Sequence, residues 1–389
     1  MEMKNTPKLR FPGFTYPWEQ RKLGEIASIN PRTELPNSFK YVDLESVIGT
    51  NLIGYKKIEK ENAPSRAQRL ASFGDIFYQT VRPYQRNNYL FEKDDDDVVF
   101  STGYAQLRSE LDSYFLFTLI QTDSFVRKVL DNCTGTSYPA INSSELGKIL
   151  ISVPQDKLES HQIGTIFRVL DNVITLHQRK LEHLKLKKKS LLQKLFPKEG
   201  EVYPELRFPG FTGPWEQCKL ADVANIIMGQ SPSSQNYTDN PNDDILVQGN
   251  ADLIDGQVVP RLWTKEITKS IDEGNIIMTV RAPVGDVAKT AYKVVLGRGV
   301  AGIKGDEYIY QFLLKLKYNH YWRSLSSGST FESINSNDIK NLIIDIPCDE
   351  ERTKIGNLLR KTDSLINLYQ RKLEHLKLLK KALLQQLFV

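Results

Sequence analysis

The sequence has few cysteines and no long apolar run. Its three cysteines, Cys133, Cys218 and Cys348, are odd in number and widely spaced, so they fit neither a disulfide framework nor a zinc site. No run of about eighteen apolar residues is present, which argues against a transmembrane helix, and the first residues lack the apolar stretch of a signal peptide. These absences predict a protein of the reducing cytoplasm that has no membrane partner.

Motifs that carry chemistry are also missing. There is no glycine-rich nucleotide loop, no phosphate-loop lysine motif, no nucleophile elbow and no Asn-Pro-Pro-aromatic methyltransferase motif. The five histidines show no metal-ligand spacing, and the acidic run at 94–97 is typical of a solvated loop. We therefore expect no catalytic residue, no metal ion and no cofactor in this chain. A formal charge of +5 permits nucleic-acid binding without requiring it.

What the sequence does contain is a tandem duplication. Residues 7–29 match residues 204–226 at sixteen of twenty-three positions, and residues 177–196 match residues 369–388 at sixteen of twenty. The stretches between them, 30–133 and 227–326, have diverged. The repeated segments form a common frame, and the diverged stretches are the variable parts that each copy of the frame holds. This arrangement is typical of a protein that recognises two different targets at a fixed separation.

Each half ends in a long helix. Apolar residues recur at alternating steps of four and three, and this period of 3.5 predicts a coiled-coil seam. Lys188 and Lys380 interrupt the two seams at matching places. We expect Asp156 or Ser160 to cap the first helix and Asp349 to cap the second. The predicted helix-pairing residues are Ile163, Phe167, Leu170, Ile174, Leu181, Leu184, Leu191, Leu195, Ile355, Leu359, Ile366, Leu373, Leu376, Leu383 and Leu387.

The diverged stretches have matching patterns of predicted elements. Strand-like runs at 75–81 and 275–280 each lead into an arginine, and helical patterns follow at 113–129 and 308–325. Asn142 and Asn335 each stand where a helix N-cap is expected. The two stretches therefore share one mixed fold despite their different sequences.

Polar side chains in these stretches suit DNA recognition. Arginine and lysine pair with guanine edges and phosphates, and asparagine and glutamine pair with adenine edges. The loops after Gly135 and Gly328 have backbone N–H groups and hydroxyls that suit phosphate, and a simple turn explains these residues equally well. Arg82 and Arg281 are the strongest candidates because each follows Thr-Val at a matching place. The candidate DNA-binding residues are Arg66, Arg69, Arg82, Tyr84, Gln85, Arg86, Asn87, Asn88, Thr136, Ser137, Gln248, Asn250, Arg261, Arg281, Arg298, Lys304, Ser329 and Thr330.

The duplicated motifs resemble one known family. The Leu-Arg-Phe-Pro-Gly-Phe and Pro-Trp-Glu-Gln segments, with Gln-Arg-Lys-Leu-Glu-His-Leu-Lys in both helices, are similar to the specificity subunit of bacterial type I restriction–modification systems. The resemblance implies double-stranded DNA as ligand and two modification subunits as partners, with restriction subunits recruited to the complex. It also implies that S-adenosylmethionine binds to the modification subunit, and that the helices pair antiparallel and set the spacing.

The predicted fold class is therefore α+β, with two similar mixed α/β target-recognition domains joined by two long antiparallel coiled-coil helices. We assign the first domain to residues 1–155 and the second to 207–347. The helices are assigned to 156–197 and 348–389, with a linker at 198–206. Two alternatives remain open: a DNA-binding regulator that dimerises through its helices without a methyltransferase partner, and a coiled-coil scaffold that does not bind DNA.

Overall fold

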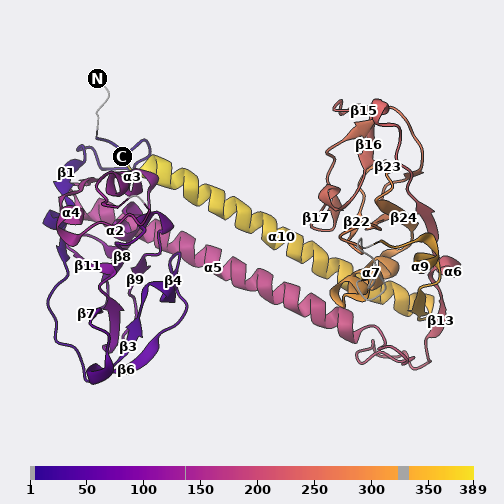
Figure 1. The fold of residues 1–389 in the computed structure, drawn as a ribbon, viewed down its shortest axis with the longest axis horizontal. Coiled ribbons are helices and arrows are strands. Elements are labelled where there is room, and N and C mark those ends of the chain that lie inside the picture. The colour runs from indigo at the N-terminus through magenta and orange to yellow at the C-terminus, as the bar shows by residue number, and fades with distance from the viewer. Residues whose placement is uncertain (1–4, 136, 323–332) are drawn as a thin grey trace. The chain divides into compact units, whose positions relative to one another are not determined.

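The computed structural model describes residues 5–135, 137–322 and 333–389 and divides the chain into two compact units. Unit 1 comprises Met1–Gln178 with Lys372–Val389, and unit 2 comprises Arg179–Arg371. The division passes through both long helices, α5 (Lys157–Lys194) and α10 (Asp349–Leu387) (Figure 1). The units thus differ from the predicted domains, which stopped where the helices begin, because each helix contributes one end to the core of each unit.

The globular part of unit 1 is built mainly from two four-stranded sheets and the short helices α2 (Ser113–Leu119), α3 (Asp123–Asp131) and α4 (Ser143–Lys148). The first sheet has the strand order β2 (Ala27–Ile29), β11 (Tyr104–Ser109), β8 (Ile76–Gln79) and β9 (Tyr89–Leu90). The second has the order β6 (Lys56–Glu59), β3 (Ser38–Val42), β10 (Val98–Ser101) and β7 (Ala67–Leu70), beside a hairpin of β4 (Val47–Ile48) and β5 (Asn51–Leu52). Every residue of β8 is buried, since α3 covers one face through Phe125 against Tyr78.

Unit 2 contains a six-stranded and a five-stranded sheet. The six-stranded sheet has the order β14 (Asn225–Met228), β24 (Val300–Lys304), β21 (Ile276–Thr279), β22 (Val287–Lys289), β18 (Gln257–Val258) and β17 (Leu253–Ile254). The five-stranded sheet has the order β15 (Tyr237–Thr238), β19 (Trp263–Thr264), β16 (Asp244–Val247), β23 (Val294–Leu296) and β20 (Ser270–Ile271). Among the described residues, α7 (Glu307–Tyr318) and α9 (Ser336–Lys340) accompany these sheets.

The two units share their strand pairing. The antiparallel set β2-β11-β8 in unit 1 corresponds to β14-β24-β21 in unit 2, and β3 with β10 are parallel as β16 with β23 are. Each unit also has one antiparallel strand pair that is followed by a one-turn helix. In unit 1 these are β1 (Glu19–Lys22), β12 (Leu150–Val153) and α1 (Leu23–Ile26). In unit 2 they are β13 (Glu216–Lys219), β25 (Ile343–Ile346) and α6 (Leu220–Val223). The expectation of one fold in both halves is confirmed.

The repeated leading segments, residues 7–18 and 204–215, anchor the frame to the long helices. In unit 1 the Arg10 guanidinium donates two hydrogen bonds, of 2.7 and 2.8 Å, to the buried Glu159 carboxylate at the start of α5. Arg207 makes the same pair of bonds to the buried Glu351 carboxylate in α10. The Glu159 carboxylate in turn raises the pKa of Arg10. Such two-pronged pairs fix geometry as well as charge, so each segment is held in one place.

Each leading segment also binds the C-terminal end of a long helix. The Leu9 amide donates to the Gln386 carbonyl at 3.0 Å in unit 1, and the Leu206 amide donates to the Lys194 carbonyl at 2.8 Å in unit 2. These carbonyls belong to the last turns of α10 and α5, where no intrahelical donor remains for them. Trp18 and Trp215 are buried beside these helix ends, with Phe388 and Phe196 as their aromatic neighbours.

The heptad pattern places the predicted seam residues inward. Leu191, Leu376 and Leu383 are half-buried and all other predicted helix-pairing residues are buried. Within each unit the N-terminal end of one long helix and the C-terminal end of the other contribute to the same core, as Phe167 and Leu387 do in unit 1, so the helices run antiparallel. Gly164 has room for no side chain, because a Cβ there would lie 2.1 Å from the Asp112 carboxylate next to α2.

Some local predictions were wrong. The expected helix at 113–129 is two helices, because Thr122 caps α3 by accepting from the Phe125 amide at 3.3 Å. Asp156 does cap α5, accepting from the Leu158 amide at 2.8 Å. Asp349, expected as a cap, is instead the first residue of α10. The expected helix at 308–325 ends at Tyr318, and its last residues lie outside the described part of the chain.

Candidate nucleic-acid interface

One loop of unit 1 gathers several of the candidate residues, and Tyr84 and Gln85 at its tip are exposed. This Arg82 loop, residues 80–88, follows β8, and its Arg82 has a φ of 54°, a left-handed conformation that is uncommon for a residue with a Cβ. The Arg82 amide donates to the Pro139 carbonyl at 2.8 Å, and its guanidinium lies 4.4 Å from the centre of the Tyr138 ring. Tyr84 is 50% exposed. The loop therefore presents two groups that are two positions apart in sequence: the Arg82 guanidinium, which stacks on Tyr138, and the exposed Tyr84 ring.

A buried glutamine holds this loop in shape. The Gln79 amide donates to the Asn88 side-chain oxygen at 2.8 Å, and the Gln79 side chain binds Gln85 at 2.9 Å and the Asn87 amide at 3.2 Å. Asn88 is only 1% exposed, and its side chain bonds the end of β8 rather than facing solvent. The Asn87 side-chain oxygen likewise accepts from the Gly49 amide at 2.8 Å.

Arg86 links the Arg82 loop to the start of α3. Its guanidinium donates to the Gln121 carbonyl at 2.9 Å and to the Asp123 carboxylate at 2.5 Å. The ion pair holds the pKa of Asp123 below its usual range. Because Arg86 already has two acceptors in the protein, Arg82 and the exposed Tyr84 and Gln85 are the residues that this loop presents.

Two further strand ends meet the Arg82 loop. The Thr80 amide donates to the Gly103 carbonyl at 3.0 Å, and the Thr102 amide donates to the Arg66 carbonyl at 2.8 Å. The exposed Arg66 therefore lies on the same edge of unit 1 as Arg82. Arg69 is half-buried in β7, where burial lowers its pKa, and its Nε has no hydrogen-bond partner among the described residues.

Unit 2 builds the corresponding edge from three loops. Arg281 follows β21 and forms a bridge with Ser333, and its side chain is exposed. The neighbouring Val280 amide donates to the Gly299 carbonyl at 2.9 Å, while the Gly297 amide donates to the Val247 carbonyl at 2.8 Å. These bonds bring the loops of Arg281, Arg298 and Gln248 together, and both Arg298 and Gln248 are exposed.

The remaining candidates of unit 2 are more scattered. Asn250 and Arg261 meet where the Arg261 guanidinium donates to the Ala251 carbonyl at 3.0 Å. Lys304 lies away from Arg281, because it ends β24 opposite Asn225 whereas the Arg281 loop meets the other end of that strand. Its ammonium pairs with Asp272 at 3.3 Å. Thr136, Ser329 and Thr330 lie outside the described residues, and Ser137 is exposed beside Tyr138.

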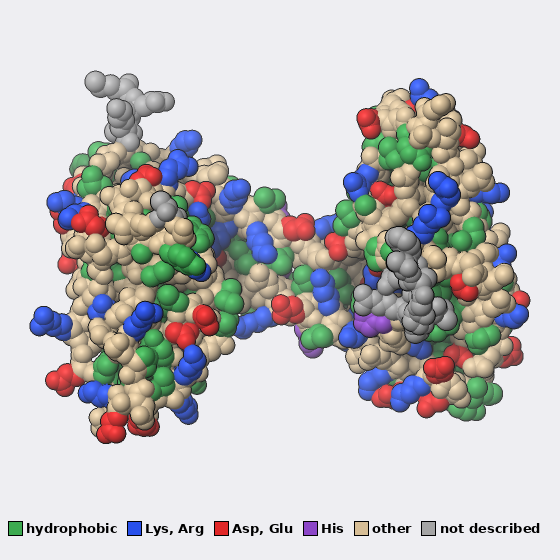
Figure 2. Space-filling model, in the orientation of Figure 1, with side chains coloured by type: hydrophobic (Ala, Val, Ile, Leu, Met, Phe, Trp, Pro, Cys, Tyr) green, Lys and Arg blue, Asp and Glu red, His purple; other side chains and the backbone are tan. Residues whose placement is uncertain are grey.

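Sequence reasoning missed two aromatic partners of these polar groups. Tyr138 stacks on Arg82, and the Tyr237 hydroxyl accepts from the Gln248 side chain at 2.8 Å. Only the position of Tyr138 in the Gly135 loop offered a signal for the first, and none existed for the second. Figure 2 shows basic and acidic side chains mixed over the visible face of each unit, so no patch of a single sign marks an interface on that face.

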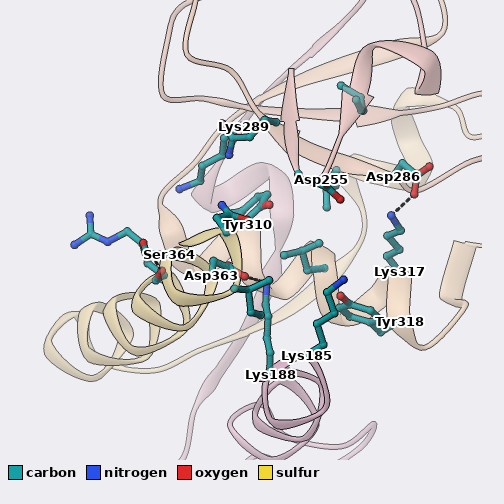
Figure 3. Close-up of a pocket in the computed structure, with 18 of the residues that line it drawn as sticks. Lys185, Lys188, Asp255, Asp286, Lys289, Tyr310, Lys317, Tyr318, Asp363 and Ser364 are labelled. Atoms are coloured by element: carbon teal, nitrogen blue, oxygen red, sulfur yellow. Dashed lines mark hydrogen bonds and ion pairs between the residues drawn. The ribbon is translucent and has the colours of Figure 1, made fainter. Parts of the chain in front are cut away.

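Unit 2 also has a cleft of about 600 Å³ beside its long helices (Figure 3). Six basic and four acidic side chains line the cleft, and most of them pair with one another. Lys289 binds Glu307 at 2.5 Å, Lys317 binds Asp286, and Lys188 binds Asp363. These ion pairs therefore neutralise most of the charge that lines the cleft. Among the residues that the structure describes, no group of three His, Cys, Asp or Glu side chains could hold a metal ion.

Comparison with known proteins identifies the class. The family described as the type I restriction modification DNA specificity domain matches residues 16–186 and again residues 212–378, which together cover most of the chain. The chain belongs to this family, whose members recognise DNA sequence for a restriction–modification system. No helix in the described ranges is long and apolar enough to cross a membrane.

Individual relatives agree over the whole length. The chain is 26% identical to the MjaX type I restriction enzyme specificity subunit of Methanocaldococcus jannaschii, covering 95% of this chain and 92% of the relative. A chain from a structural study of type I R-M complex assembly is 28% identical, with a TM-score of 0.55 over 98% of this chain and 99% of that one. The S subunit from M. genitalium shares the fold, with a TM-score of 0.68, 15% identity and 99% of both chains covered.

Arg82 and Arg281 lead to a direct test of this interface. If the guanidinium reaches a base edge, Arg82→Ala should weaken binding by about 1–3 kcal/mol and relax the preference at one half-site only. If it reaches phosphate, binding should weaken similarly on all sequences, and the slope of log K against log salt should fall by about one. Titrations of target and scrambled duplexes at several salt concentrations separate the two.

The matched control is Arg127→Ala, which removes the same charge from an exposed position on α3. It should leave affinity and sequence preference as in the unmodified chain. A protein carrying both Arg82→Ala and Arg281→Ala that keeps full affinity and salt dependence would remove both arginines from the interface.

Proposed function

We propose that this chain reads a DNA site in two unlike halves, one through each globular domain. The observation that carries the proposal is that both units share strand pairing and anchoring frame while they expose different side chains. Unit 1 offers the exposed Arg66 and Tyr84 with the half-buried Arg82, and unit 2 offers the exposed Gln248, Arg281 and Arg298. A shared frame with unlike readers suits an asymmetric site with a fixed spacer between its halves.

We propose further that the chemistry belongs to partner subunits. Two modification subunits, each binding S-adenosylmethionine, transfer the methyl group, and restriction subunits join them on DNA. The family to which the chain belongs supports this division of work. The study that includes the 28% identical chain likewise concerns the assembly of a type I complex.

The purified chain is expected to transfer no methyl group to DNA and to cut none, because it carries no cofactor-binding or catalytic motif. Together with its modification subunit it is expected to methylate adenine at a two-part motif. Methylome sequencing of a host that expresses both proteins checks the second expectation, and a radiolabelled methyl-transfer assay on the purified chain checks the first. Methyl transfer by the chain alone, or a single uninterrupted motif from the complex, would contradict the proposal.

A further inference from the structure

Two carboxylates occupy equivalent positions in the long helices and make equivalent contacts. Asp171 in α5 accepts from the Lys380 ammonium of α10 at 2.5 Å, within unit 1. Asp363 in α10 accepts from the Lys188 ammonium of α5, within unit 2 (Figure 3). Both aspartates and both lysines are 192 residues apart in sequence, so the duplication has kept the pair. Lys188 and Lys380 interrupt the apolar seams at matching places, as His177 and Tyr369 do.

Each carboxylate also accepts a bond from its own globular domain. The Tyr114 hydroxyl on α2 donates to the second oxygen of Asp171 at 2.9 Å. The Gln311 amide on α7 donates to the second oxygen of Asp363 at 2.8 Å, and Gln311 is fully buried. Tyr114 is the second residue of α2 and Gln311 is the fifth residue of α7, so the two globular domains reach the carboxylate from different positions of corresponding helices. Three elements therefore meet at one carboxylate in each unit: its own helix, the opposite helix and a globular domain.

An apolar heptad seam cannot fix its own register. Leucines recur every seven residues, so a slip of one heptad, about 10 Å along the helix, sets apolar residues against apolar residues again. A slip by seven would take Lys188 from Asp363 to Gly356 or Gln370, neither of which carries a charge. The Lys188 side chain is 7% exposed, so it would lose its partner without regaining water. The ion pairs therefore distinguish one register from its neighbours.

We propose that Asp171 and Asp363, with Lys380 and Lys188, are the positioning residues that set the spacer of the DNA site. Each carboxylate adds to the bonds that the leading segment makes with the helix ends, and it favours one register of the two helices and one position of the globular domain on them. Because this rests on the proposed two-part site, the register determines how many base pairs separate the halves. Three base pairs of DNA extend about 10 Å, so a slip of one heptad matches a change of about three base pairs.

The test uses the full chain with its modification subunit. Methylation rates are measured on duplexes that keep both half-sites and vary the spacer from three base pairs shorter to three longer. Lys188→Met with Lys380→Met should lower the preference for the native spacer by about tenfold or more, since the seam then tolerates other registers. Base preferences within each half-site should stay unchanged, because the reading loops are untouched.

Two further variants make the result specific. Lys189→Met with Lys381→Met removes the same charges from exposed neighbouring positions and should keep the native preference. Lys188→Asp with Asp363→Lys reverses the pair, and the buried Gln311 side-chain oxygen, which has no partner among the described residues, can accept from the new lysine. This reversed pair should retain the spacer preference, and it keeps the test valid if the methionine variant fails to fold.

The outcomes separate this inference from the proposed function. If the unmodified complex methylates no two-part motif, the proposed function fails. If it does, and the folded methionine variant discriminates spacers as before, the register assignment is overturned. A loss of methylation that is equal on all spacers, or a folded reversed pair that has lost the preference, overturns it as well.

Discussion

A chain that carries Leu181→Asp together with Leu373→Asp is expected to lose the pairing of its long helices. Both leucines are 8% exposed and occupy equivalent seam positions, one in each unit. A buried carboxylate without a partner costs about 3–5 kcal/mol, and a whole domain is stable by only about 5–15 kcal/mol. We therefore expect a clear loss of helical circular dichroism and a melting temperature lower by roughly 10 °C or more.

The duplication supplies the control for this experiment. Leu186 and Leu378 are also equivalent leucines of the same helices, but they are 68% and 66% exposed. Leu186→Asp with Leu378→Asp introduces the same charges where water solvates them, so helicity and melting should stay close to those of the unmodified chain. Equal melting curves for the seam and surface variants would show that the assigned seam is wrong.

The long helices could be predicted from sequence because their signal is local and appears twice. A period of 3.5 over about five heptads leaves one apolar stripe, and the buried residues follow that stripe closely. The charged interruptions could not be interpreted in the same way. Lys188 is acceptable in the seam only because Asp363 lies opposite it, 175 residues away, and helix periodicity carries no information about that pairing.

The leading segments show the same limit. Their repetition within the chain indicated a shared role. The two-pronged bond from Arg10 to Glu159 could not be predicted, because the partners are 149 residues apart. A contact of this kind becomes visible only when the fold brings the start of one long helix to the leading segment.

The candidate DNA residues were predicted from side-chain chemistry, and chemistry alone does not tell a reading side chain from a structural one. Asn88 and Arg86 have the polarity that suits DNA, yet Asn88 is buried against Gln79 and Arg86 is occupied by Asp123. The loop needs these bonds because Arg82 and Arg86 both have left-handed backbone conformations, which are costly for residues with a Cβ. Asn88 and Arg86 therefore stabilise the strained loop through these hydrogen bonds, although their side-chain chemistry suits DNA.

Exchanging residues 30–150 for the corresponding stretch of a relative is expected to replace one half of the methylated motif completely. The exchange leaves the frame in place, since β1 and nearly all of β12 lie outside it and their register from Glu19↔Val153 onward is kept. Asn30 and Ser143, which bond at 2.7 Å across the exchanged stretch, move together. Methylome sequencing should then report one new half, one unchanged half and the original spacer.

An added heptad in each long helix gives the complementary result. Seven residues lengthen a helix by about 10 Å, so the spacer should change while both halves of the motif stay as they were. The exchange and the insertion therefore act on separate properties if each unit reads alone and the helices only separate the readers. An exchange of residues 30–150 that altered both halves with the spacer intact would mean that the second unit depends on the first for its specificity, and independent reading would have to be given up.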